Sequence, residues 1–232
     1  MRRPVPTEEI LTARHAIRSG RPPRELAGEV DARILDAARE VFLERGLAGA
    51  SMDEIAGFAR AGKPTIYARF PSKEALFTAV VMRNVADKIA RFETYEPTGE
   101  TIEERLASVG ETVLRWVFVG DTIGLMRLAI AEARRFPELA SSVHRMALER
   151  ATEAVARLLG EAAQSEEFGT LSAFAPNHLA TTTASFVDLV VMPLIIEALF
   201  GEKAETLCGE IGPHVTRAVR FFLAACRHGG AG

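Results

Sequence analysis

The sequence predicts an all-α protein with a small N-terminal helical head and a larger C-terminal helical body. Apolar residues recur at helical spacing along most of the chain after residue 31. Capping signals and Gly or Pro breaks separate the successive periodic stretches. No segment shows the alternation of apolar and polar residues that indicates a strand. Hydrophobic residues make up 48% of the 232 residues and charged residues 25%, as in ordinary globular proteins.

Composition favours a cytoplasmic protein without a membrane span. The longest apolar stretch, 186–200, is interrupted by Asp188, Pro193 and Glu197, so no run reaches the roughly 18 residues that a span needs. The N-terminus carries no apolar segment before a cleavage site, so no secretory signal is expected. The two cysteines form no CxxC pattern, so we expect no disulfide framework, no metal site and no cofactor.

Charge is distributed unevenly along the chain, although the net charge is only −3. Residues 1–95 hold 16 Lys and Arg against 13 Asp and Glu, whereas residues 96–232 hold 12 against 18. A basic front half favours docking onto a polyanion such as DNA. Residues 1–30, which include "SGRPPRELAGE", are predicted to form a basic arm or linker. Whether residues 1–24 enter a minor groove or remain a mobile tail stays open.

Three helices are predicted between residues 31 and 71. The first covers 31–45 and ends at Gly46, which can adopt the left-handed conformation of a helix stop. The second opens with "SMDE", in which Ser51 and Glu54 can form a capping box. After a tight turn, "GKPTIYARF" forms a short third helix with Pro64 in its first turn, where the missing backbone donor costs nothing.

The second and third helices form a helix-turn-helix, whose second member enters the major groove of DNA. At 100° per residue, Ile66 and Phe70 share one face and pack inward. The opposite face carries Pro64, Thr65 and Arg69: threonine can contact thymine or phosphate, and arginine can bond guanine through two donors. A DNA-binding head is therefore predicted at 31–77, with a fourth helix continuing to about residue 93.

Five further helices are predicted for a body at 98–228, covering 101–119, 122–135, 138–164, 176–200 and 203–227, with a kink at Pro193. Apolar stripes along the last two helices predict a four-helix dimer interface, and packing inside one protomer is the alternative. The predicted interface residues are Val187, Val191, Leu194, Ile195, Val215, Val219 and Phe222.

The body is too apolar for a passive spacer and is expected to bind a small, lipophilic effector among its helices. Methionine and aromatic side chains suit a hydrophobic site, with histidine or threonine as polar anchors. The candidate contacts are Trp116, Met126, His144, His178, Thr182 and Phe186. The alternative is that each of them belongs to an ordinary core.

Residues 31–77 resemble the DNA-binding domain of the tetracycline-repressor (TetR/AcrR) family. The matching features are "ILDAAREVFLERG", "SMDEIA", the "TIY" and Phe of the third helix, and "SKEAL". This resemblance implies a homodimer, a palindromic double-stranded operator and a C-terminal domain whose small-molecule effector weakens DNA binding. The segment "RLAIAEARRFPELASSVHRMALERATEAVARLL" resembles the AefR-like subset of C-terminal domains.

The resemblance also assigns residues at the DNA. It implies groove contacts from Lys63, Pro64, Thr65, Tyr67 and Arg69, and phosphate contacts from Lys73 and Ser51. The chain departs from the family in the turn of the helix-turn-helix. The family usually has glycine, valine and serine there, whereas this chain has Arg60, Ala61 and Gly62. We therefore expect either strain at Arg60, because glycine adopts a positive φ more readily than arginine does, or a slightly different turn.

These features predict a ligand-responsive dimeric transcriptional regulator, with repression as the main hypothesis and activation left open. An architectural DNA-binding protein without an effector is the alternative. An enzyme is disfavoured because the sequence has no Walker A, GxGxxG, HExxH or GxSxG motif and its five histidines are scattered.

Overall fold

The computed structural model describes residues 24–93, 95–166 and 168–228, which contain helices and no strand. The all-α prediction is confirmed. In chain order the elements are α1 (Arg24–Gly49), α2 (Met52–Ala59), α3 (Lys63–Tyr67), α4 (Lys73–Glu93), α5 (Ile102–Phe118), α6 (Thr122–Ala131), α7 (Pro137–Ala162), the short 3-10 helix η1 (Ser172–Phe174), α8 (Leu179–Val190), α9 (Met192–Leu199) and α10 (Ala204–Arg227).

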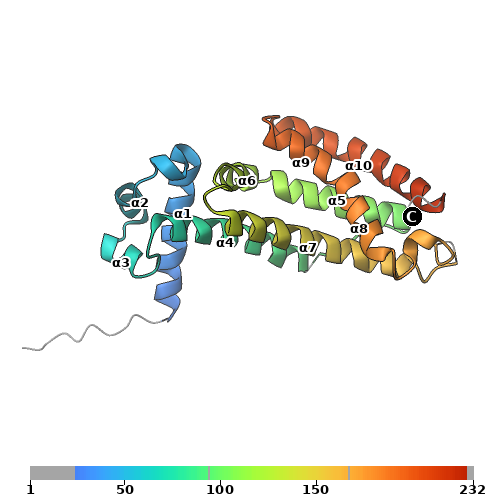
Figure 1. Ribbon diagram of the computed structural model, residues 1–232, viewed down its shortest axis with the longest axis horizontal. Helices are drawn as coiled ribbons and strands as arrows, with labels where there is room; N and C mark the ends of the chain where they lie inside the picture. The colour runs from blue at the N-terminus through green and yellow to red at the C-terminus, as the bar shows by residue number, and fades with distance from the viewer. Residues whose placement is uncertain (1–23, 94, 167, 229–232) are drawn as a thin grey trace, which may run out of the picture.

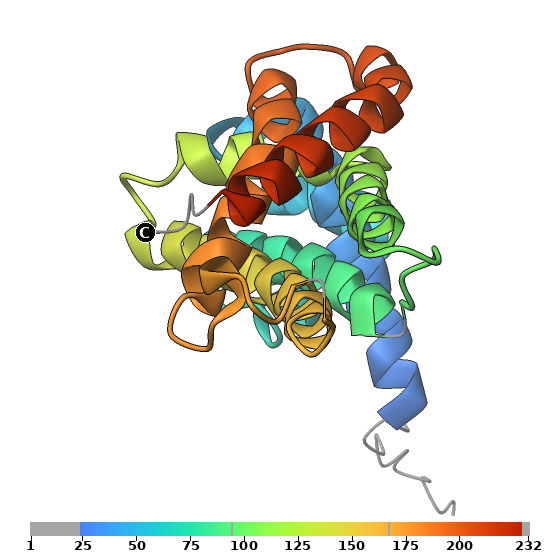
Figure 2. The ribbon, with the colours of Figure 1, turned by 90° about the vertical axis from the view of Figure 1, so that its right-hand side faces the viewer.

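The helices form an elongated molecule with the head at one end and the body at the other (Figure 1). Helices α1, α2 and α3 make the head, and α4 runs from the head along the underside of the body beside α7. Helices α9 and α10 form the opposite side, with α5 packed between the two sides. Figure 2, which looks along the body toward the head, shows α10 crossing above α4 and α7.

The head core is built on α1, whose buried residues recur at helical spacing. Ile34, Val41 and Phe42 are almost completely buried, and the Phe42 ring meets the Phe77 ring of α4 edge to face at 5.4 Å. Each fully buried phenylalanine contributes about 1.5–3 kcal/mol to folding. Leu125 of α6 and Leu139 of α7 belong to the same core. The head is therefore packed directly against the body.

The residues predicted for the dimer interface lie in the body core. All seven predicted interface residues are buried inside the protomer, with exposed fractions between 0 and 7%. The apolar stripes that carry these residues face α5 and one another, because α10 packs along α5 and α8. The Phe222 ring of α10 meets the Phe186 ring of α8 edge to face, with the ring centres 5.3 Å apart. A side chain that is already buried cannot provide much contact area to a second copy. The alternative, packing inside one protomer, is what the structure contains.

The start of the first helix differs from the prediction. Helix α1 begins at Arg24, so residues 24–30 are helical where a linker was expected; "ELAGEV" contains good helix formers and no proline to stop the helix. Gly46 has φ +68° and ψ 172°, so it kinks the helix with a positive φ, but its ψ lies outside the left-handed helical region predicted for a stop, and α1 continues to Gly49. Residues 1–23, most of the expected arm, lie outside the described residues.

The predicted helix 176–200 is divided at Val191. Helix α8 ends at Val190 and α9 begins at Met192, with Pro193 in its first turn. Proline has no N–H to donate to the preceding turn, which is the physical reason for the break. By length and composition alone, Leu179–Leu199 is apolar enough to cross a membrane, contrary to the expectation from the sequence. In this fold it is instead two core helices that bury Phe186 and Val190.

Candidate nucleic-acid interface

The turn between α2 and α3 is closed by a strained residue. Arg60 has φ 50° and ψ 43°, the left-handed conformation, and it is the only residue other than glycine with a positive φ in the described part of the chain. Its N–H, at the C-cap position, donates back to the last turn of α2. The structure therefore keeps a left-handed residue at Arg60, an unfavourable conformation for a residue with a Cβ atom, and does not form a different turn. Gly62 then starts α3 in an extended conformation.

Helix α3 is anchored by one face and leaves the other face open. Ile66 is completely buried in the head core and Phe70 is half-buried, as their spacing predicted. Lys63, Pro64 and Tyr67 are exposed, and the Tyr67 side chain retains 47% of its accessible surface. An exposed tyrosine beside a lysine and a proline gives this face both hydrogen-bonding and apolar contact surface.

Both cations of the α3 segment form ion pairs with neighbouring helices. Lys63 Nζ pairs with Asp53 of α2, and Arg69 Nε pairs with Asp31 of α1. Arg69 Nη1 also donates to the carbonyl oxygen of Thr65 at 3.2 Å. The Arg69 side chain is only 23% exposed. Sequence reasoning identified the two cations but missed both carboxylates, because the partners come from different helices, one of them 38 positions away.

The two predicted phosphate contacts also have structural roles. Lys73 Nζ donates to the carbonyl oxygens of Ala50 at 2.8 Å and Ala48 at 3.3 Å, at the end of α1. An ammonium group has three donors, so one remains for another acceptor. Ser51 Oγ accepts from the Glu54 N–H at 3.1 Å and so caps α2 as predicted.

The reciprocal half of the capping box is corrected by the structure. The Glu54 carboxylate was expected to reach back to the start of α2. It pairs instead with Arg45 of α1 at 3.3 Å. An arginine side chain within reach offers a charged donor in place of a backbone N–H, and hydrogen bonds with two charged partners are the stronger ones.

Polar contacts join the head to the body. Arg39 Nη1 pairs with Asp121 at the start of α6 at 2.8 Å, and Arg135 Nη2 pairs with Glu74 at the start of α4 at 2.9 Å. Hydrogen bonding from its own backbone N–H lowers the pKa of Glu74, and Ser72 and Arg135 lower it further against the opposing effect of burial. In the described part of the chain, Arg39 Nε and the Thr122 hydroxyl are buried without a hydrogen-bond partner.

The predicted effector residues are dispersed through the body. Phe186 is fully buried, and the Thr182 hydroxyl donates to the Ala173 carbonyl oxygen at 2.6 Å. Trp116 is half-buried and meets the Tyr95 ring at 5.7 Å. Met126 and His178 are half-buried, on α6 and at the start of α8. The side chain of His144 lies outside the described part. These positions leave the effector site a prediction.

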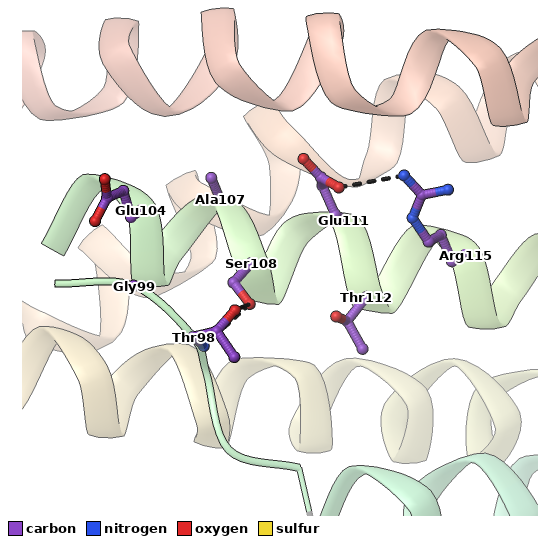
Figure 3. Close-up of a pocket in the computed structure, with 8 residues that line it drawn as sticks. All are labelled: Thr98, Gly99, Glu104, Ala107, Ser108, Glu111, Thr112 and Arg115. Carbon is purple, nitrogen blue, oxygen red and sulfur yellow. Dashed lines mark hydrogen bonds and ion pairs between the residues drawn. The ribbon is translucent and has the colours of Figure 1, made fainter. Parts of the chain in front are cut away.

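Two hollows open on the body surface. One, of about 410 Å³, lies along α5 beside the segment that precedes α5 (Figure 3). At this hollow the hydroxyl and the backbone N–H of Thr98 are hydrogen-bonded to the Ser108 hydroxyl at 3.0 and 3.2 Å. Glu111 forms an ion pair with Arg115. The other, of about 400 Å³, lies between α8 and α10 and is lined by Thr182, Ser185, Asp188, Leu189, Phe221, Phe222, Ala225 and Cys226. Burial raises the pKa of the Cys226 thiol, which therefore stays protonated at neutral pH.

A short, exposed recognition helix held by a helix-turn-helix, joined to a larger helical body, defines a DNA-binding regulator. Residues 34–80 match the bacterial regulatory proteins of the tetR family, and residues 104–227 match the C-terminal domain of AefR-like transcriptional repressors. The chain belongs to the tetR family of transcriptional regulators and carries an AefR-like C-terminal domain. The members of this family are regulators of transcription, not enzymes.

Individual relatives support the same assignment. The chain is 32% identical over 142 residues to the transcriptional activator FasR of Mycolicibacterium smegmatis, covering 61% of this chain and 63% of FasR, less than two thirds of its length. It is 29% identical over 141 residues to the transcriptional repressor Rv3405c of Mycobacterium tuberculosis, covering 61% of this chain and 71% of that protein.

Solved structures of regulators share the fold over most of the chain. A tetR-family regulator from Mesorhizobium loti matches with a TM-score of 0.71 and 27% identity, covering 86% of this chain and 97% of the other. The flavonoid-responsive regulator FrrA matches with a TM-score of 0.61 and 29% identity, with the same coverage.

Proposed function

We propose that this protein is a homodimeric repressor that binds a palindromic operator in the cytoplasm and is released by a small, lipophilic effector. The observation that carries the proposal is the exposed face of α3 in a head that belongs to the tetR family. A five-residue helix with its inner face in the core has no structural need for an exposed Tyr67. Its outer face is the part of the head suited to a DNA groove.

In this proposal, α3 enters the major groove with Lys63, Pro64, Thr65 and Tyr67 at the bases and the sugar-phosphate backbone. Arg69 reaches the groove with the donors that Asp31 and Thr65 leave free. Two flanking residues would then bind phosphate: Lys73 through its third donor, and Ser51 through its hydroxyl hydrogen, because its oxygen is the atom that caps α2.

The groove between α8 and α10 is the proposed dimer surface. Phe221 of α10 lines this groove and is 67% exposed, which is unusual for a large apolar side chain on a core helix. In a two-fold dimer, each copy would place Phe221 against the α8–α10 groove of the other, which is a self-complementary contact. In this proposal the outer faces of α8 and α10 form the dimer contact, while their inner apolar stripes form the body core.

A dimer would hold two heads about 34 Å apart, one turn of DNA, so that both α3 helices meet successive major grooves. An effector that prefers a body with another head spacing must weaken DNA binding by reciprocal linkage. The contact between head and body supports such a coupling. Lys73 and Glu74 are adjacent at the start of α4, and Glu74 forms an ion pair with Arg135 of the body. A lever movement of α4 would therefore be transmitted to Lys73.

The proposed effector class rests on the body and on one relative. Phe186 and Thr182 are packed, so an effector that reaches them must open the core and gain free energy by filling it. The responsiveness of FrrA to flavonoids supports a planar, lipophilic molecule as the first candidate. Arg39 Nε and the Thr122 hydroxyl are buried without a hydrogen-bond partner. This raises the free energy of the present contact between head and body and so favours its rearrangement.

The proposal is tested by footprinting the DNA that flanks the protein's own gene, with and without a panel of flavonoids and other lipophilic compounds. We expect a protected palindrome that the double variant Thr65→Ala, Tyr67→Ala no longer selects over unrelated DNA, and at least one compound that releases the wild-type protein. Loss of both contacts should weaken operator binding by about 10-fold or more. Protection that is unchanged by the double variant would contradict the assignment of α3.

The direction of regulation is tested separately, since the relatives include both an activator and a repressor. A reporter gene placed behind the footprinted sequence should be silenced by the protein and induced by the releasing compound. Expression that rises when the protein is supplied would identify an activator instead, with the same DNA-binding head.

A further inference from the structure

Each cation of the α3 segment is held by a carboxylate of another helix. Asp53 of α2 pairs with Lys63, and Asp31 of α1 pairs with Arg69. The four side chains together carry no net charge, so they attract a polyanion weakly as a group. We propose that Asp31 and Asp53 are specificity-determining residues, which suppress sequence-independent binding to DNA. This inference rests on the proposed function of the head.

The contacts of Arg69 limit what its guanidinium group can bind. An arginine has five N–H donors in a rigid plane, and here Nε is bonded to Asp31 and Nη1 to the Thr65 carbonyl oxygen. Three donors remain, on Nη1 and Nη2, and we call the part of the group that carries them the open edge. A phosphate at an arbitrary position cannot reorient the group without breaking both contacts. A base edge or phosphate placed at the open edge binds without that cost.

The ion pair between Lys63 and Asp53 affects DNA binding through its charge and not by orienting the lysine. Both Lys63 and Asp53 are largely exposed, and exposed ion pairs contribute little to stability. The pair can therefore open when an operator offers a well-placed acceptor. In a loose encounter with unrelated DNA, however, a phosphate must compete with Asp53 for the same ammonium group, and the carboxylate itself repels the phosphate.

These contacts affect the two kinds of complex differently. Sequence-independent binding depends almost entirely on phosphates neutralised by lysine and arginine, each of which adds about 0.9 to the slope of log affinity against log salt concentration. A carboxylate that neutralises one of these cations removes that contribution. Operator binding depends in addition on directed contacts, which an oriented Arg69 makes more easily. Because specificity is the difference between the two affinities, the carboxylates increase it.

The test compares Asp31→Asn and Asp53→Asn with Glu40→Gln as the matched control. Glu40 is exposed on α1 and lies nine residues from Asp31, on the opposite side of the helix, so its substitution changes the net charge equally without touching α3. Affinity for the footprinted operator and for an unrelated duplex of equal length is measured at several salt concentrations, and thermal unfolding confirms that each variant is folded.

For each aspartate variant we expect affinity for unrelated DNA to rise about two- to fivefold and the salt slope to steepen by up to about 0.9, while operator affinity changes by less than about twofold. Glu40→Gln should leave the ratio of the two affinities unchanged. Asp31→Glu retains the carboxylate and should retain the wild-type slope, which keeps the test valid if Asp31→Asn unfolds.

Two results would overturn the inference: equal gains on operator and unrelated DNA, or a change in the ratio from Glu40→Gln as large as that from the aspartate variants. Wild-type protein that binds neither DNA would instead refute the proposed function. Wild-type protein that binds the operator, with aspartate variants that behave like it, would refute this inference alone.

Discussion

Arg60 is the residue at which this head departs most clearly from the usual helix-turn-helix of its family. The turn needs a left-handed residue, and Arg60 adopts that conformation at φ 50°. For a residue with a Cβ atom this conformation costs about 1–2 kcal/mol, whereas glycine adopts it freely but loses more conformational entropy on folding. The sequence located the residue at which the turn departs from the family, because the helix on either side of the turn is strongly specified, but it left open whether the turn would be strained or different.

Replacing Arg60 by glycine should therefore stabilise the protein, by about 0.5–1 kcal/mol after the entropy of glycine is counted. Replacement by valine should destabilise it by about 1 kcal/mol or more, because a β-branched side chain is worse still at positive φ. Thermal and chemical unfolding of the two variants beside wild type measure the difference. Equal stability of the glycine and valine variants would mean that the turn relaxes out of the left-handed conformation in solution.

At the scale of elements, the sequence predicted capping better than it predicted partners. Thr101 and Glu104 form a capping box in the segment "TIEE" at the start of α5, with Thr101 Oγ1 accepting from the Glu104 N–H at 3.2 Å. Such boxes are local, so a few neighbouring residues decide them. The Glu54 carboxylate had an alternative partner in Arg45, which only the packing of α1 against α2 brings near. Ion pairs between distant residues leave no local signal.

The capping box of α5 makes stability depend on pH in a defined direction. Hydrogen bonds from the backbone N–H groups of Thr101 and Glu100 lower the pKa of Glu104 below its ordinary value. Because the folded-state pKa is the lower one, the stabilisation is complete above the unfolded-state pKa and is lost as pH falls through the folded-state pKa. Glu104→Gln should therefore lower the Tm near neutral pH, and the difference from wild type should disappear in acid.

The control for this prediction is Glu100→Gln, which removes a neighbouring charge but leaves the box intact. Its Tm should follow that of wild type across the pH range. Thr101→Ala should cost about 1 kcal/mol by removing the cap itself. A Glu104→Gln variant whose Tm differs from wild type equally at neutral and acid pH would show that the carboxylate contributes through something other than its ionised hydrogen bonds.

At the scale of the molecule, the same apolar pattern permits two arrangements. The stripes of the last helices predicted burial either at a dimer interface or inside one protomer, because hydrophobic spacing does not say which surface covers a side chain. Val215 and Val219 face α5 of their own chain, as their complete burial requires. Phe221, two residues from Val219, lies on the outer side of the same helix. The exposed residue was the informative one, and only the fold identifies it.

Phe221→Asp should therefore separate the proposed dimer without unfolding either copy. A charge on each side of a two-fold contact is repelled by its own symmetry mate, while the exposed position means that the protomer core is untouched. Light scattering should give the 25.2 kDa of one chain for the variant and twice that mass for wild type, with similar Tm values at low concentration. Operator affinity should fall about 10-fold or more, because the two heads no longer bind as one unit.

Phe200→Asp provides the matched comparison. Phe200 is 90% exposed at the end of α9 and does not line the α8–α10 groove, so this variant should remain a dimer and keep its operator affinity. A dimer that survives Phe221→Asp but is lost in Phe200→Asp would move the interface to the end of α9. In that case the spacing of the two heads, and with it the way in which an effector could alter that spacing, would have to be derived from α9.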